Sequence, residues 1–145
     1  MIDQIKKRAL IEHIKQRKTS AAEELLLPPD LFFDGYDDKH CVICANNSEP
    51  ITTSDFASRL LQVRHKPEVS GVYVRVCDFS DAEEFEECWI TSDSIYVVTT
   101  ARVGKVREWF SDFEVSDIWE EKDHSQFGGL PLLSKDSRLI AVWWD

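Results

Sequence analysis

Glycine is scarce in this chain, with five residues among 145. Loops that cradle phosphates depend on glycine, because their backbone N–H groups must approach the ligand closely. The sequence contains no Walker loop, no dinucleotide fingerprint, no Gly-x-Ser-x-Gly elbow and no His-Glu-x-x-His pair. We therefore expect no nucleotide-binding site of these types and no common hydrolase mechanism, and we predict no cofactor.

Long apolar runs are also absent, whereas crossing a bilayer takes about 20 consecutive apolar residues. The chain starts Met-Ile-Asp-Gln-Ile-Lys-Lys without the apolar stretch of a secretory signal. We therefore expect a cytoplasmic protein with reduced cysteines, which are Cys41, Cys44, Cys77 and Cys88. The Val-Ile between the first two is typical of a strand, which would point their thiols to opposite faces. We accordingly expect neither a zinc site nor a redox site there.

Basic residues are outnumbered, with 17 Lys and Arg against 27 Asp and Glu and a net charge of −10. Residues 1–18 reverse this balance: six basic and two acidic side chains give +4, which leaves −14 for the other 127 residues. An acidic domain repels nucleic acid and anionic membranes and attracts basic proteins. The composition thus excludes nucleic-acid and membrane partners and favours a basic protein partner.

The beginning of the chain predicts a helix over residues 2–18. Its apolar side chains form a modest stripe, with Ile2, Ile5 and Ala9 on one side, Leu10 and Ile14 nearby, and basic residues elsewhere. We treat residues 1–27 as an N-terminal basic helical extension and residues 28–145 as the folded domain.

From residue 41 the pattern predicts an α+β fold. Strands are expected at 41–45, 71–77, 94–99 and 139–144, with helices at 51–64 and from about 100 to 110. The segment 94–99 is apolar on both faces, which indicates a central strand. This order is that of a ferredoxin-like β-α-β-β-α-β sandwich, with helices on one face of a mainly antiparallel sheet.

Three short motifs carry a resemblance. They are the turn Phe32-Phe33-Asp34-Gly35-Tyr36-Asp37-Asp38, the Ser92-Asp93 pair before a hydrophobic run, and the terminal Trp143-Trp144-Asp145. Together they resemble a group of small, acidic, uncharacterised bacterial proteins, over roughly residues 30–145. An Asn that is common after the turn glycine in that group is replaced here by Tyr36. The resemblance implies a single-domain bacterial protein and no particular activity.

Two acidic segments contain aromatic residues. Residues 78–87 hold six acids, with Phe79, Phe85 and Trp89 among or beside them, and residues 114–123 repeat the pattern with Phe113 and Trp119. A solvated loop explains the charge alone, but aromatic anchors within charge are typical of a protein-binding patch. We predict a non-catalytic domain that binds a basic protein, with an immunity protein against a basic bacterial toxin as its most specific form. The predicted contact residues are Asp81, Glu83, Glu84, Glu86, Glu87 and Trp89, followed by Asp117, Glu120 and Glu121.

Two other hypotheses remain open. Asp34, Asp37 and Asp38, with His40, could form a small metal-dependent or catalytic site, although Asp-Gly and Asp-Asp are also ordinary turn sequences. Alternatively, the basic helix 2–18 of one copy could dock on the acidic face of another and form a homo-oligomer.

Overall fold

The computed structural model describes residues 1–18 and 24–145. Within them, six strands form one sheet in the order β4-β6-β3-β2-β1-β5. The strands are β1 (Glu24–Leu27), β2 (Val69–Arg75), β3 (Ser94–Thr99), β4 (Asp117–Glu121), β5 (Phe127–Gly128) and β6 (Arg138–Trp143). The helices are α1 (Gln4–Arg17), α2 (Pro29–Phe32), α3 (Thr53–Arg64), α4 (Ser80–Glu84) and α5 (Val103–Trp109), with a 3₁₀ turn, η1, at Val42–Cys44. The molecule is therefore a single-domain α+β fold, as the sequence predicts.

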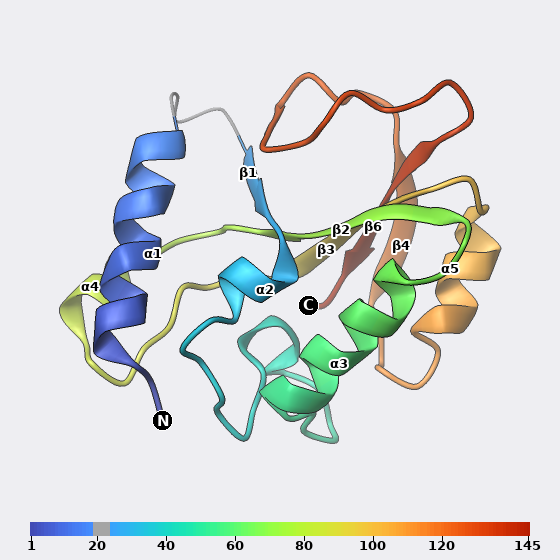
Figure 1. The fold of residues 1–145 in the computed structure, drawn as a ribbon. Helices are drawn as coiled ribbons and strands as arrows, with labels where there is room; N and C mark the ends of the chain where they lie inside the picture. Colours follow the sequence, from blue (N-terminus) through green and yellow to red (C-terminus); the bar gives the residue numbers. More distant parts are fainter. Residues whose placement is uncertain (19–23) are drawn as a thin grey trace.

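Alternation along the strands gives the sheet two different faces. Val72, Val74 and Val76 of the β2 segment point toward the helices, whereas Tyr73 points to the opposite face. The central strand β3 is buried along its whole length, because both of its faces are covered. All five α-helices supply the main core, and the segment 122–137 covers part of the other face, arching over the sheet in Figure 1.

An aromatic cluster closes the main core beneath α3 and α5. The Trp144 ring lies 5.2 Å from Phe56 and 6.1 Å from Phe110, in edge-to-face arrangements. Its indole N–H donates to the Phe113 carbonyl at 2.8 Å, which satisfies the one polar group of the ring. Trp143, in contrast, is half-buried on the other face, so the two adjacent tryptophans have different environments.

The sheet differs from the predicted ferredoxin-like one in its strands: the first predicted strand is absent, and β1, β4 and β5 are additional. Residues 41–45, expected as the first strand, form the 3₁₀ turn η1 instead. Cys41, Ile43 and Cys44 are all buried while Ala45 is exposed, a pattern that the two-residue repeat of a strand cannot produce. The strand beside β2 is β1, and the two pair antiparallel.

The first 27 residues, expected as a basic extension, contribute both α1 and β1 to the fold. The inward side of α1 consists of Lys7, Leu10, Ile11 and Ile14, which is the i, i+3, i+4, i+7 spacing of a helix face. The predicted stripe through Ile5 and Ala9 is wrong, since both side chains are exposed.

Two isoleucines of α1 that differ in burial provide a matched test of stability. Ile14 is fully buried and Ile5 is 78% exposed. Ile14→Ala should lower the free energy of unfolding by about 2–5 kcal/mol, because it leaves a cavity in the core. Ile5→Ala should change it by less than about 0.5 kcal/mol. Urea unfolding followed by tryptophan fluorescence measures both, and equal small effects would show that α1 is not part of the core.

Candidate functional site

The first acidic segment folds as the short helix α4 and the turn after it, and lies beside α1 (Figure 1). Asp78 organises its start: its carboxylate accepts hydrogen bonds from the backbone N–H groups of Phe79 at 2.7 Å and Ser80 at 3.0 Å, and from the Ser80 hydroxyl at 2.8 Å. The bonds from Ser80 are the main cause that holds the pKa of Asp78 below its usual value. The local backbone is thus fixed before the exposed acids begin.

A buried lysine from α1 holds the other end of this segment. Lys7 is only 5% exposed, and its ammonium group donates to the carbonyl oxygens of Phe85 at 2.9 Å, Glu86 at 3.2 Å and Cys88 at 3.0 Å. The three bonds use the full donor capacity of the group, which explains how a charge is accommodated here. Gln4 adds a fourth contact, from its amide to the Glu86 carbonyl at 2.9 Å. The turn after α4 is therefore anchored to α1 by its backbone, and its acidic side chains point outward.

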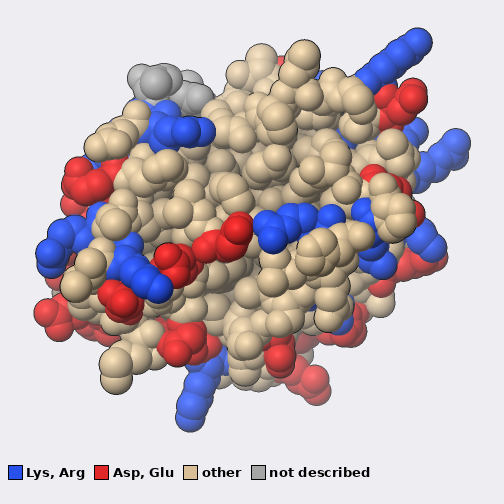
Figure 2. Space-filling model, in the orientation of Figure 1, with Lys and Arg blue, Asp and Glu red and all other residues tan. Residues whose placement is uncertain are grey.

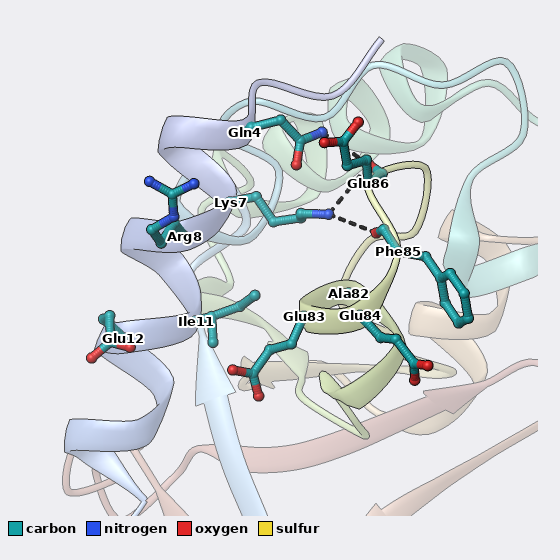
Figure 3. Close-up of a pocket in the computed structure, with 10 residues that line it drawn as sticks. All are labelled: Gln4, Lys7, Arg8, Ile11, Glu12, Ala82, Glu83, Glu84, Phe85 and Glu86. Atoms are coloured by element: carbon teal, nitrogen blue, oxygen red, sulfur yellow. Dashed lines mark hydrogen bonds between the residues drawn. The ribbon is translucent and has the colours of Figure 1, made fainter.

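Between α1 and α4 runs a groove with a volume of about 530 Å³. In Figure 3 the Lys7 side chain crosses from α1 toward the Phe85 and Glu86 carbonyls, with Ile11 and Ala82 nearby. The lining combines these apolar groups with charged ones; the complete set is Gln4, Lys7, Arg8, Ile11, Glu12, Ala82, Glu83, Glu84, Phe85 and Glu86. A groove of this composition suits a chain that carries both apolar and cationic side chains.

The five predicted acids of this segment are all exposed, as their sequence pattern indicates. They are Asp81, Glu83, Glu84, Glu86 and Glu87. Glu83 pairs with Lys15 of α1 at 2.7 Å, and that bond raises the pKa of Lys15. Within the described chain the other four carboxylates make no ion pair. We call these four residues and Phe85 the α4 patch.

Trp89 lies inside the protein and cannot insert into a partner as the sequence reading required. It is 3% exposed, stacks on Tyr36 with ring centroids 5.1 Å apart, and donates its indole N–H to the Phe32 carbonyl at 3.1 Å. Burial of the large indole next to the Phe-Phe turn explains this outcome. Phe85 is instead the exposed aromatic of the segment, at 45%, and Phe79 is half-buried.

The second acidic segment forms the edge strand β4, on the side of the molecule opposite α4 in Figure 1. Its carboxylates have partners in the chain. Glu120 pairs with Lys122 at 3.1 Å and Arg138 at 3.4 Å, and Glu121 accepts the Trp119 indole N–H at 3.2 Å. Asp117 accepts from the backbone N–H of the next residue at 2.8 Å. These three predicted contact residues thus form a surface separate from the α4 patch, and their charge is partly neutralised.

The acids of the Phe-Phe turn are likewise engaged. Asp34 pairs with Lys6 at 2.9 Å, and both Asp37 and Asp38 face the N-terminal amine. In residues 1–18 and 24–145, no three Asp, Glu, His or Cys side chains come together as metal ligands would. The geometry of this turn therefore favours its structural reading over a metal-dependent site.

Three of the basic residues of α1 contact other parts of their own chain. Lys6, Lys7 and Lys15 reach the turn after α2 or the α4 segment. Arg8 and Arg17 are exposed, and self-assembly through residues 1–18 stays a prediction.

A polar network at one end of the sheet was not predicted from the sequence. The Asp93 carboxylate accepts hydrogen bonds from Ser94 at 2.7 Å, Arg75 at 3.2 Å, Trp143 at 3.3 Å and the Cys77 thiol at 3.5 Å. It joins β2, β3 and β6, so the Ser-Asp motif and the terminal Trp motif meet in space. The sequence indicated this network only by containing both motifs of the resemblance, and the contacts between them are structural.

On one face of the molecule, charge is not gathered into a single region. Figure 2 shows acidic and basic side chains interspersed over the face it presents. The α4 patch is distinguished by the spacing of its acids: four exposed carboxylates without ion partners in the described chain lie within seven residues of sequence, together with the exposed Phe85.

Comparison with known proteins places the chain among bacterial sequences. The sequence model described as "Uncharacterized protein YfbO family" matches residues 5–142. "Uncharacterized protein YfbO" of Escherichia coli (strain K12) is 28% identical over 122 residues, which cover 83% of this chain and 82% of that protein. No solved structure matches the chain. Among the described residues, none of the helices is long and apolar enough to cross a membrane.

The Lys7 anchor can be tested against its neighbour. Lys7→Met keeps most of the apolar stem but removes the ammonium donor from three carbonyl oxygens. The Phe85 and Glu86 carbonyls keep one other donor each, from the Cys88 N–H and the Gln4 amide, whereas the Cys88 carbonyl loses its lysine partner. The free energy of unfolding should therefore fall by about 1–3 kcal/mol. Lys6→Met removes only the exposed pair with Asp34 and should cost less than about 1 kcal/mol. Amide hydrogen exchange should also accelerate in residues 80–88 of the first variant alone. Unchanged exchange there would contradict the anchoring role.

Proposed function

We propose that this chain, which belongs to the Uncharacterized protein YfbO family, is a non-catalytic domain that binds a basic protein through the α4 patch. One observation carries the proposal: Lys7 fixes the backbone of the turn from inside, while four exposed carboxylates without ion partners in the described chain lie within four residues of the exposed Phe85. We place the interaction in the cytoplasm.

Unneutralised carboxylates at close spacing repel one another, which disfavours the free protein. Lys or Arg side chains of a partner would relieve this repulsion and would be attracted over several ångströms at low salt. Phe85, which is 45% exposed, adds apolar contact area within this acidic segment, as an interface anchor does. Charge complementarity thus favours a basic protein with an apolar spot among its cations as the partner.

The most specific form of the proposal is an immunity protein. Nucleases that act as toxins need a basic active site to bind the phosphate backbone. An acidic patch held on a rigid backbone would cover such a site and compete with the nucleic acid. This form predicts that the partner is a nuclease and that binding inhibits it.

Paired charge variants test the proposal on a partner captured from the native cell. Glu84→Gln with Glu86→Gln should slow association about tenfold at low salt and flatten its dependence on ionic strength. Glu49→Gln with Asp136→Asn removes the same net charge elsewhere on the surface and should leave the rate within about twofold. Phe85→Ala should instead mainly accelerate dissociation, because it removes apolar contact rather than charge.

Surface plasmon resonance at several salt concentrations gives both rate constants. If both double variants slowed association equally, net charge alone would explain the effect, and this result would contradict a binding site at α4. Capture of an acidic partner, or one whose binding is insensitive to all three variants, would also contradict it.

A further inference from the structure

The 3₁₀ turn changes the relation between Cys41 and Cys44. In such a turn, residues three apart lie on the same side, separated by one turn of about 6 Å. In the strand that the sequence suggested, they would be about 10 Å apart on opposite faces. A disulfide requires Cα atoms about 4.4–6.8 Å apart, so the observed turn permits a bond that a strand would forbid.

The Cys44 thiol contacts the first residue of this segment: its sulfur lies 4.0 Å from the Cys41 carbonyl oxygen. Each thiol is the main influence on the pKa of the other, which is raised for Cys41 and lowered for Cys44. The thiolate is the reactive form of cysteine.

Both side chains are buried, at 1% and 3% exposure, but the segment that carries them lies at the surface. Ala45 and Asn46 follow directly and are exposed, and together with Val42 and Ile43 they line one side of a hollow of about 250 Å³. Short irregular segments of this kind open locally without unfolding of the whole molecule. A small opening of this turn would give an oxidant access to the pair.

We propose that Cys41 and Cys44 form a reversible intramolecular disulfide when the protein meets hydrogen peroxide. The Cys44 thiolate attacks a peroxide oxygen, the O–O bond breaks, and hydroxide leaves and takes up a proton as water, which leaves a sulfenic acid on Cys44. The Cys41 sulfur then attacks the Cys44 sulfur, the S–S bond forms, and the hydroxyl group leaves with the thiol proton as a second water. The two thiols are oxidised and one peroxide is reduced; a dithiol reverses the bond by exchange.

Cys77 and Cys88 provide an internal comparison. Neither has a cysteine three residues away, and the Cys77 thiol donates to Asp93 instead. Burial is the main cause that raises the pKa of Cys77, which keeps that thiol protonated. The 41–44 pair differs from these two in having a second thiol one turn away, so peroxide should produce an intramolecular disulfide between Cys41 and Cys44 and none at Cys77 or Cys88.

The experiment treats the folded protein with hydrogen peroxide, removes the oxidant, denatures the chain and alkylates all remaining thiols before mass spectrometry. The supporting result is a loss of about 2 Da with Cys41 and Cys44 linked and with Cys77 and Cys88 alkylated. Dithiothreitol should restore four alkylated cysteines. Unchanged tryptophan fluorescence during oxidation verifies that the protein remains folded.

Serine variants show which cysteines form the bond. Cys77→Ser with Cys88→Ser should still form the linked species at the native rate, whereas Cys44→Ser should not form it. Alkylation of all four cysteines after treatment would overturn the proposal. So would disulfides between chains, or irreversible oxidation of Cys44 without linkage.

Discussion

The ammonium group of Lys7 is the interaction on which the arrangement of this surface depends. It is a charge inside the protein, and it is tolerated because three backbone carbonyls surround it. Those carbonyls belong to a turn whose own side chains are mostly acidic. The same contact therefore satisfies a buried cation, completes the inward face of α1 and directs the neighbouring carboxylates to solvent.

The sheet provides the rigid frame for this contact. Helices cover one of its faces, and α1 and α4 meet at one side of that layer, where they leave the groove between them (Figure 1). The other side of the molecule carries β4, with acids that already have partners. The two acidic segments have similar compositions but different surfaces. Glu120 of β4 has two basic neighbours, Lys122 and Arg138, whereas the α4 segment has a single ion pair, between Glu83 and Lys15.

Several parts of this fold could be predicted from the sequence alone. Alternation in β2, the doubly apolar β3 and the spacing of Phe56, Leu60 and Val63 in α3 follow directly from burial on one or two faces. The residues that were misjudged are those whose environment is made by distant segments. Lys7 is buried because carbonyl oxygens 78 to 81 residues away accept hydrogen bonds from its ammonium group. Trp89 is buried because its ring stacks on Tyr36 and its indole N–H donates to the Phe32 carbonyl. Neither set of distant contacts can be predicted from the neighbouring sequence. The spacing of Lys7 with Leu10, Ile11 and Ile14 is the one local sign that Lys7 faces inward.

The position of β6 in the sheet has a consequence for how the chain reaches this structure. It lies between β3 and β4, yet it follows both in sequence. β4 pairs along its length with β6 and has no other strand neighbour among the described residues, so it cannot join the sheet before β6 has done so. Closing these loops is entropically unfavourable before the pairing compensates, which favours slow assembly. A hairpin of β2 and β3 would serve as the early template, and β4 would remain an unpaired acidic segment, kept soluble by its charge, until the last strand arrives.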